Sequence, residues 1–275
     1  MALRDTTDGH SALPIRLVPA AATHTGKRYF LTGAARGLGA GIARLLTAQG
    51  AKVWGADLLV DELATVAAEG ALAGCSFLDV GSPDSITRAV NEAAAGLGGF
   101  DGAVNVAGFA RPGEPLDADW ALWQRTFEIN VFGSYEVARR VSAHMIADNC
   151  HGAIVNTASE AGKVGHVDSL PYSASKAAVI SMTRMLSVAL APHDINVNCV
   201  CPGGMPTQML RDVARNYAAT LGGDENTLFD RLISTQLRRH TSIEEVAAIY
   251  SFLLTDAAAM IRGQAVNADA GDTPY

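Results

Sequence analysis

The sequence has few cysteines and no cysteine motif. Its 275 residues include only Cys75, Cys150, Cys199 and Cys201, and no two of them form a CxxC pair. This scarcity disfavours a disulfide framework or a zinc site built on cysteine pairs. The pattern favours buried, reduced thiols in a cytosolic protein.

Basic residues and long apolar runs are also scarce. The 21 Lys and Arg are outnumbered by 28 Asp and Glu, which leaves a net charge of -7. Nucleic acids and anionic membranes are bound by clustered basic side chains, so small molecules are the expected partners. No segment approaches the roughly 18 uninterrupted apolar residues of a membrane span. We expect a cytoplasmic protein without membrane association.

The first 26 residues differ from the remainder of the chain. Asp5, Asp8 and Arg16 interrupt any apolar run there, so no signal peptide is indicated. We expect residues 1–26 to form a loosely ordered arm and residues 27–275 to form one domain.

From Lys27 onward, short apolar segments alternate with longer segments of helical periodicity. The predicted strands lie within 28–33, 51–57, 74–80, 101–108, 152–159, 195–203 and 263–269, and the predicted helices within 37–49, 59–70, 82–97, 119–148, 171–191 and 205–255. Near-continuous apolar strands between helices are typical of parallel sheets covered on both faces. The sequence therefore predicts an α/β fold with a doubly wound, mainly parallel, seven-stranded Rossmann-type sheet. Ligands of such sheets bind beyond the carboxyl ends of the strands.

The first predicted strand ends in TGAARGLG, which places Gly33, Gly37 and Gly39 at a strand-to-helix turn. Glycines there allow the backbone to approach a pyrophosphate, which rests on the helix N-terminus. The spacing is GxxxGxG and not the general GxGxxG. Asp57 closes the next strand 18 residues after Gly39, where a carboxylate for an adenosine ribose is expected. This region predicts a dinucleotide site.

The stretch PYSASKAA places Tyr172 and Lys176 four residues apart, on one face of a helix. A free phenol titrates near pH ~10 and is a poor base at neutral pH. A cation about 4 Å away is worth roughly 4 kcal/mol at an effective dielectric near 20, but only about 1 kcal/mol in water. The pair therefore suits acid/base chemistry only in a partly dry site. A surface tyrosine beside a solvated lysine remains the alternative for the pair alone.

Taken together and in order, these motifs resemble the classical group of the short-chain dehydrogenase/reductase family. The resemblance covers residues 27 to 270. It rests on TGAARGLG, DV at 79–80, NVAG at 105–108, Asn130, Ser159 in NTASEAG, Tyr172 and Lys176 in YxxxK, and PGGMPT at 202–207. The family more often has NNAG, and little consequence is expected from Val106 because Asn105 is kept.

The resemblance implies a catalytic set of Asn130, Ser159, Tyr172 and Lys176. Tyr172 would be the general acid/base for the substrate oxygen, and Ser159 would hydrogen-bond the same oxygen. Lys176 would hold the nicotinamide ribose and lower the pKa of the phenol, while Asn130 would anchor a water behind Lys176. The implied cofactor-binding residues are Gly33, Arg36, Gly37, Leu38, Gly39, Asp57, Asp79, Val80, Asn105, Ala107, Gly108, Tyr172, Lys176, Pro202, Gly203 and Thr207.

The expected function is an NAD(H)-dependent oxidoreductase that interconverts a secondary alcohol and a ketone. NAD is expected because Asp57 would repel the 2′-phosphate of NADP, although Arg36 in the turn suits a phosphate. Two alternatives stay open: an NADPH-dependent carbonyl reductase of the ketoacyl type, and a dinucleotide-binding sensor without catalysis. The resemblance also implies a homotetramer assembled through the two long helices, of which 171–191 carries the small residues Ala174, Ala177, Ala178 and Ser181.

The substrate is expected between the loop at 160–170 and the segment that follows Pro202. Glu160 and His166 would lie on one side. Met205, Met209 and Leu210 would form an adaptable apolar lid on the other.

Two rival constellations are weaker. Ser159, His166 and Asp168 lie close in sequence, but TASEA is not the GxSxG elbow of a hydrolase. His240 and Glu244 do not form an HExxH motif. We therefore expect neither a hydrolase triad nor a metal.

Overall fold

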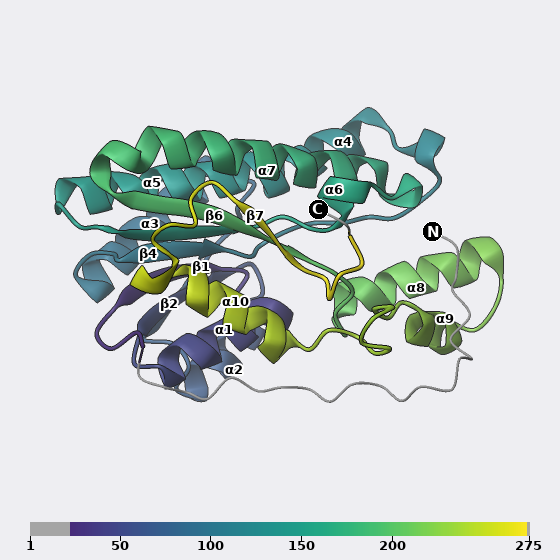
Figure 1. The fold of residues 1–275 in the computed structure, drawn as a ribbon, viewed down its shortest axis with the longest axis horizontal. Helices are drawn as coiled ribbons and strands as arrows, with labels where there is room; N and C mark the ends of the chain where they lie inside the picture. Colours follow the sequence, from purple (N-terminus) through teal and green to yellow (C-terminus); the bar gives the residue numbers. More distant parts are fainter. Residues whose placement is uncertain (1–22, 274–275) are drawn as a thin grey trace.

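A seven-stranded parallel sheet forms the centre of the molecule (Figure 1). The computed structural model describes residues 23–273, without the side chains of Val167, Thr220 and Leu221. The strand order is β3-β2-β1-β4-β5-β6-β7, and every neighbouring pair is parallel, which confirms the predicted doubly wound Rossmann-type sheet. The strands are β1 (Arg28–Thr32), β2 (Lys52–Asp57), β3 (Gly74–Phe77), β4 (Gly102–Asn105), β5 (Gly152–Thr157), β6 (Ile195–Pro202) and β7 (Ala265–Ala268).

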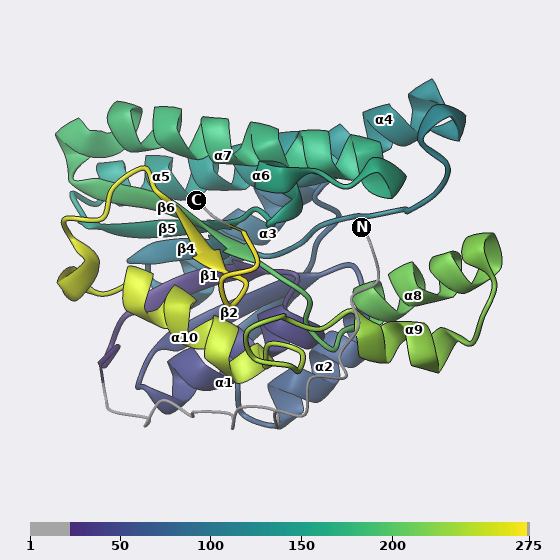
Figure 2. The same cartoon turned by 45° about the vertical axis from the view of Figure 1, so that its right-hand side comes forward.

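Helices cover both faces of the sheet (Figures 1 and 2). One face carries α1 (Gly37–Ala48), α2 (Val60–Ala68) and α10 (Ile243–Leu253), and the other carries α3 (Pro83–Leu97), α5 (Ser134–Ala147) and α7 (Leu170–Leu190). The remaining helices are α4 (Trp120–Phe127), α6 (Ala161–Val164), α8 (Gln208–Leu221) and α9 (Glu225–Arg231). Of these, α4, α8 and α9 lie at the right-hand end of both views, where the strands have their carboxyl ends, and α6 lies beside α7.

The alternation of side chains along each strand produces two cores. In β1, Leu31 is buried against α1 and α10, whereas Phe30 is buried against α3 and α5. Successive residues of a strand point to opposite faces, so a strand covered on both sides must be apolar throughout. Each fully buried side chain of this size contributes about 1.5 to 3 kcal/mol. This explains the near-continuous apolar strands of the sequence.

Polar residues at the helix starts define where the covering helices begin. The Ser82 hydroxyl accepts the backbone N–H of Ser85 at the start of α3, where Pro83 takes the first helical position. At the start of α10, Ser242 and Glu245 form a reciprocal capping box.

The segment predicted as one helix at 119–148 is divided by a π-helical turn. The turn covers Glu128–Gly133 and lies between α4 and α5. It contains Asn130, which the sequence places in the middle of a long helix. A π-turn leaves backbone hydrogen-bonding groups out of the regular ladder, and such turns are frequent at functional sites. Similarly, the predicted loop at 160–170 contains α6 and a short 3₁₀ turn at Val167–Ser169.

The four cysteines are free, but only two of them are buried. Cys199 and Cys201 are fully buried on β6, as expected for core residues, whereas Cys75 is exposed and Cys150 is half-buried. The expectation of buried thiols is therefore wrong for Cys75 and Cys150. Cys75 is exposed because β3 is an edge strand of the sheet.

One helical segment, Leu170–His193, is long and apolar enough to cross a membrane by length and composition alone. It contains α7, which packs on β6 and α6 and carries Tyr172 and Lys176. Core helices of globular proteins share these properties, so the segment is weak evidence for a membrane span.

The predicted arm, residues 1–26, lies outside the described residues except for its last four. Of these, His24 is buried: its Nδ1 lies 2.9 Å from the Tyr29 hydroxyl and its Nε2 lies 3.1 Å from Ser251 Oγ. Ser251 Oγ donates to Gln49 Oε1 at 2.6 Å, so it accepts from His24 Nε2–H. Nδ1 then accepts the Tyr29 proton. A chain of hydrogen bonds therefore joins β1, α10 and α1 through a neutral His24.

We expect this neutral His24 to make stability fall in mild acid. Burial lowers the pKa of His24 below its ordinary value of 6.5, so the folded state resists a proton that the unfolded chain accepts. The stability is retained above about pH 6.5 and decreases as the pH falls below that value, by at most about 1.4 kcal/mol per pH unit. Thermal unfolding of wild type and His24→Gln across about pH 5 to 8 measures this.

The variant should show a weaker pH dependence than wild type, although it is less stable at neutral pH. His193→Gln, which changes an exposed histidine, is the matched control and should keep the wild-type pH dependence. Identical pH dependence in wild type and His24→Gln would contradict the assignment.

Candidate active site

The predicted site residues lie at the carboxyl ends of the strands, beside α4, α6, α8 and α9 (Figure 2). Five strands end at a residue of the predicted set or within two residues before it. These are β1 with Gly33, β2 with Asp57, β4 with Asn105, β5 with Ser159 and β6 with Pro202. Because the strands are parallel, these residues share one edge of the sheet. This is the edge at which doubly wound sheets bind their ligands.

The glycine turn is shaped for close approach of a ligand to the backbone. Gly33 and Gly37 have φ values of +70° and +53°, which side chains other than glycine rarely adopt. A Cβ on Gly33 would lie 2.7 Å from the Ala107 nitrogen, and a Cβ on Gly39 would overlap the Gly33 carbonyl. The turn leads into the N-terminus of α1, whose exposed N–H groups favour an anion. These features fit a pyrophosphate.

Asp57 is held rigidly beside this turn. Its Oδ2 accepts the Ala35 N–H and its Oδ1 accepts the Leu59 N–H, both at 3.0 Å. Each carboxylate oxygen keeps a free lone pair, so the group can still accept hydroxyl donors. Arg36, in contrast, is exposed at the start of α1 and makes no side-chain hydrogen bond to the described residues. Asp57 is therefore fixed and Arg36 is free to move.

The other predicted cofactor residues surround the same turn. Thr32 Oγ1 accepts the N–H groups of Val106 and Ala107 at 3.1 and 3.2 Å, which ties the NVAG segment to β1. A Cβ on Gly37 would lie 3.6 Å from Thr207, so the PGGMPT segment reaches the glycine turn. Leu38 and Asn105 are buried. The Asp79 side chain accepts the Gly81 N–H at 2.8 Å. The Val80 carbonyl packs against Gly133.

Tyr172, Ser159 and Lys176 come together at the end of β5 and the start of α7. The Ser159 hydroxyl is hydrogen-bonded to the Tyr172 side chain. The Lys176 ammonium lies 5.5 Å from the centre of the Tyr172 ring and donates to the Thr157 carbonyl at 2.7 Å. Lys176 is almost fully buried. An ammonium has three donors, so Lys176 keeps two for a ligand. The structure therefore excludes the solvated surface pair.

Burial dominates the ionisation of this pair. It raises the pKa of Tyr172 to about 12, with Ser159 acting to lower it and the charge of Glu160 acting to raise it. Burial likewise lowers the pKa of Lys176 to about 8. This is opposite to the predicted lowering of the phenol's pKa, because desolvation penalises the phenolate more than the nearby ammonium stabilises it. An additional positive charge is needed to ionise Tyr172.

Asn130 is fully engaged with protein groups. Its Oδ1 accepts the Phe109 N–H at 2.7 Å, and its Nδ2 donates to the Phe109 carbonyl and to Ser175 Oγ, each at 2.9 Å. A Cβ on Gly108 would lie 3.4 Å from Asn130 Oδ1 and 3.6 Å from Lys176 Nζ. The side chain thus joins the NVAG segment to α7 beside the Lys176 ammonium. Its predicted role as an anchor for water stays a prediction.

Glu160 and His166 face each other next to Tyr172. Glu160 Oε1 lies 3.7 Å from His166 Nε2, and both side chains are about one-fifth exposed, at 20% and 21%. Glu160 Oε2 would lie 3.4 Å from a Cβ on Gly203, so the pair borders the PGG segment. Of the predicted lid, Met205 packs on the main core, Leu210 packs between α8 and α9, and Met209 is 40% exposed.

The sequence did not single out the contact between Asp168 and Tyr217. The Asp168 carboxylate lies beside the Tyr217 phenol of α8 and raises the pKa of that phenol, and the Asp168 carbonyl accepts the Gly113 N–H at 2.8 Å. Asp168 therefore joins three segments around the site. Asp168 contacts Tyr217, and His166 contacts Glu160. Ser159, His166 and Asp168 therefore do not form a hydrolase triad. His240 stacks on Phe229, with ring centres 4.5 Å apart.

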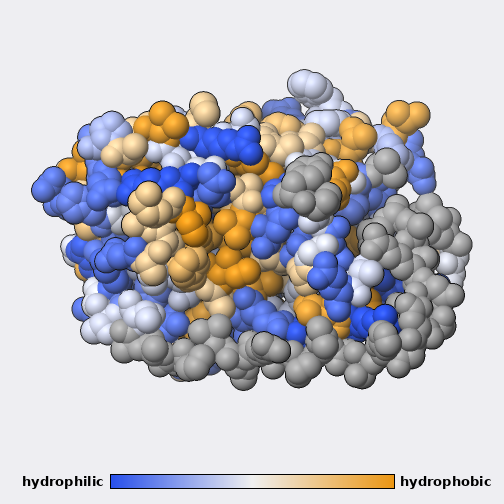
Figure 3. All heavy atoms as spheres, in the orientation of Figure 1, coloured by the Kyte–Doolittle hydropathy of each residue, from blue (hydrophilic) through white to orange (hydrophobic). Residues whose placement is uncertain are grey.

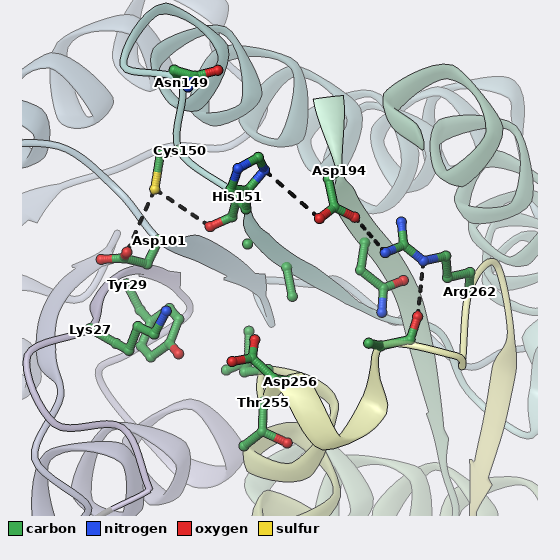
Figure 4. Close-up of a pocket in the computed structure, with 15 residues that line it drawn as sticks. Lys27, Tyr29, Asp101, Asn149, Cys150, His151, Asp194, Thr255, Asp256 and Arg262 are labelled. Atoms are coloured by element: carbon green, nitrogen blue, oxygen red, sulfur yellow. Dashed lines mark hydrogen bonds and ion pairs between the residues drawn. The ribbon is translucent and has the colours of Figure 1, made fainter. Parts of the chain in front are cut away.

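A second cavity, of about 520 Å³, lies at the opposite edge of the sheet (Figure 4). Its charged residues are mostly paired: Asp194 with Arg262 at 2.6 Å, and Asp101 with Arg28 at 2.8 Å. Burial and Asp101 raise the pKa of the Cys150 thiol, which is therefore not an activated nucleophile. Tyr172 does not line this cavity.

Fold and site together define a dinucleotide-binding α/β protein with a buried tyrosine and lysine pair. Residues 33–273 match the family model described as Enoyl-(Acyl carrier protein) reductase. With this match and the relatives below, the chain belongs to the short-chain dehydrogenase/reductase family.

Known proteins are similar over nearly the whole chain. A putative ketoacyl reductase of the monensin polyketide synthase from Streptomyces virginiae is 37% identical, over 90% of this chain and 97% of its own length. A cis-4-hydroxycyclohexanecarboxylate dehydrogenase from Sinomonas cyclohexanicum is 36% identical, over 88% and 95%. The structure of an NAD⁺-bound xylitol dehydrogenase superposes with a TM-score of 0.82 at 30% identity, over 89% of this chain and 98% of that one.

Proposed function

We propose that the protein is an NAD(H)-dependent oxidoreductase that interconverts a secondary alcohol and a ketone, with Tyr172 as the general acid/base. The observation that carries this proposal is the hydrogen bond between Tyr172 and Ser159 beside the buried Lys176 ammonium. A sensor without catalysis would have no need for a buried cation next to a buried phenol, since both are costly to desolvate.

The glycine turn, Asp57 and Lys176 would hold the dinucleotide. Asp57 would accept the adenosine ribose hydroxyls, and the two free donors of Lys176 would reach the other ribose. When bound, the dinucleotide supplies the hydride acceptor or donor and, in its oxidised form, a positive ring.

Tyr172 and Ser159 would bind the substrate oxygen. In alcohol oxidation, Tyr172 takes the hydroxyl proton while Ser159 holds that oxygen; in ketone reduction, Tyr172 returns the proton. Since burial holds the phenol protonated at neutral pH, Tyr172 is ready to donate its proton in ketone reduction, and alcohol oxidation depends on positive charge arriving beside Tyr172.

The direct test is a screen of the purified protein against secondary alcohols and ketones with both dinucleotides. Turnover of a secondary alcohol with NAD⁺ supports the proposal. Turnover of ketones alone, and only with NADPH, would favour a ketoacyl-type reductase. Arg36 is the observation that supports this second candidate, because it is exposed in the glycine turn and free to meet a 2′-phosphate.

Replacing Glu160 by glutamine should lower the pKa that governs alcohol oxidation. The negative charge of Glu160 raises the pKa of Tyr172, so its removal should move the ascending limb of kcat/KM for alcohol oxidation, where activity rises with pH, toward lower pH. Glu62→Gln, which changes an exposed residue of α2, is the matched control and should leave the profile in place. An unchanged or raised pKa in Glu160→Gln would contradict the contact.

Two exposed apolar surfaces support assembly as a homotetramer. The first lies on α5, α7 and the turn before α5 and includes Phe132, Tyr135, Met185 and Val188, with Val188 71% exposed. Figure 3 shows a second apolar surface over β7 and α10, and the exposed large apolar side chains of this region are Phe252 and Met260. A tetramer with two kinds of interface would bury both.

Light scattering at micromolar concentration is expected to give about four times the chain mass of 28.7 kDa. A monomer mass would contradict the assembly. Val188→Glu should reduce the mass, because a charge buried in an apolar interface is strongly unfavourable. Small-molecule partners and a cytoplasmic location stay predictions.

A further inference from the structure

Glu160 has unused hydrogen-bonding capacity next to the reacting oxygen. Its carboxylate accepts no hydrogen bond from the part of the chain that the structure describes, and Oε1 lies 3.7 Å from His166 Nε2, with which it forms an ion pair when His166 is protonated. The side chain directly follows Ser159 and lies against Gly203. A carboxylate that is four-fifths buried and has free lone pairs is suited to accept hydroxyl protons from a ligand.

Asp168 is a second acceptor, in the segment that joins Glu160 to α7. It lies in the turn just before α7, and its Oδ2 is buried without a hydrogen-bond partner among residues 23–273. The carboxylate also lies beside the Tyr217 phenol of α8, whose pKa it raises. Buried polar atoms are normally paired, so an orphaned oxygen points to a ligand donor or a water at this position.

Two lysines of this region, Lys163 and Lys176, are already engaged with other groups. Lys163 donates to the Ala265 carbonyl and to Asn267, and Lys176 donates to the Thr157 carbonyl. A second carbonyl near the reacting carbon, as in a β-ketoacyl thioester, offers only an acceptor and gives no hydrogen to a carboxylate such as Glu160. Hydroxyl donors there would meet acceptors.

We propose that the substrate is a neutral polyol or vicinal diol, whose second hydroxyl donates to Glu160 and whose further hydroxyls reach Asp168. This inference rests on the proposed function, since it assigns the substrate class of the same site. It adds a specificity role for Glu160 and Asp168 that is separate from the proton transfer by Tyr172.

Matched substrates test the inference. Initial rates are measured with NAD⁺ and with NADP⁺. Two pairs differ by one hydroxyl: 2-butanol with 2,3-butanediol, and cyclohexanol with trans-1,2-cyclohexanediol. The amino alcohol 3-amino-2-butanol carries a cation in place of the second hydroxyl. In the reverse direction, 3-hydroxy-2-butanone is compared with an acetoacetyl thioester of N-acetylcysteamine. The diols should have kcat/KM values at least about ten-fold above those of the mono-alcohols, and the hydroxyketone should exceed the acetoacetyl thioester by the same factor. A site built for a hydroxyl rejects the analogue that lacks it.

Variants then assign the preference to residues. Glu160→Gln should bring the ratio of diol to mono-alcohol close to unity, and Asp168→Asn should reduce it. The ratio is unaffected by changes in the pKa of Tyr172, since both substrates share that residue. Glu62→Gln is the control and should keep the wild-type ratio. Thermal unfolding confirms that each variant is folded, and either acidic variant alone suffices if the other fails to fold.

The outcomes separate this inference from the proposed function. Oxidation of mono-alcohols and diols with equal kcat/KM, or preference for the acetoacetyl thioester, would overturn the polyol assignment and leave the alcohol dehydrogenase intact. Preference for the amino alcohol would show that the acids select a cation and would also overturn it. No oxidation of any alcohol with either dinucleotide would overturn the proposed function and this inference together.

Discussion

Replacing Tyr172 by phenylalanine is expected to reduce kcat by at least 10²- to 10⁴-fold, the range that a positioned general acid/base contributes. The change removes one oxygen that contacts Ser159 and the substrate. It leaves the glycine turn, Asp57 and the hydrogen bond from Lys176 to Thr157 in place. The dissociation constant for the dinucleotide should therefore stay within about two- to three-fold of wild type, which corresponds to less than about 0.7 kcal/mol. Steady-state rates and calorimetric titration measure the two effects separately.

Lys176→Ala is the informative comparison. Lys176 would contact the cofactor and also lies beside the Tyr172 ring, so its loss should weaken dinucleotide binding and turnover together. Retention of more than a small fraction of kcat in Tyr172→Phe would remove the acid/base role. A large loss of dinucleotide affinity in that variant would show that the phenol serves binding.

The wild-type protein is expected to prefer NAD over NADP by about 100-fold in kcat/KM, which corresponds to about 2.7 kcal/mol. A 2′-phosphate at Asp57 would place a charge of about -1.5 to -2 against a carboxylate. Asp57 cannot move away without losing the N–H groups of Ala35 and Leu59. Arg36 has no such contacts and cannot offset the repulsion without being ordered first.

Asp57→Ala should therefore reduce the preference for NAD. The test is the ratio of kcat/KM with NAD to kcat/KM with NADP, measured for the variant and for wild type. In the double variant Asp57→Ala with Arg36→Ala, the gain with NADP should be lost again, because Arg36 is then unable to contact the phosphate. Equal kcat/KM values for the two cofactors in wild type would overturn the assignment and favour the NADPH-dependent reductase.

The sheet and the glycine turn could be predicted because each depends on local sequence. Strands covered on both faces are buried throughout, as β6 is, and are therefore mostly apolar, while a turn with positive φ values requires residues such as Gly33 and Gly37. The Tyr172 and Lys176 pair was likewise visible because both residues lie on one helix, four positions apart. Such features need no knowledge of the rest of the fold.

Other features depend on contacts between distant segments. The contact of Asp168 with Tyr217 joins residues far apart in sequence, and the π-turn around Asn130 depends on packing between α4 and α5. The raised pKa of Tyr172 results from its burial, which the sequence alone does not quantify. The direction of that pKa is therefore the main point at which sequence reasoning and structure differ.

The central position of β1 in the sheet also has a consequence for how the chain folds. β1 is the first strand of the sequence, yet one of its two neighbours is β4, and the contact of Arg28 with Asp101 spans 73 residues. Closing so long a loop costs entropy before the pairing can compensate for it, so the central pair of strands forms late. Until then, one edge of β1 has unpaired backbone groups and its apolar side chains are uncovered. Folding speed and resistance to aggregation therefore depend on how soon β4 reaches β1.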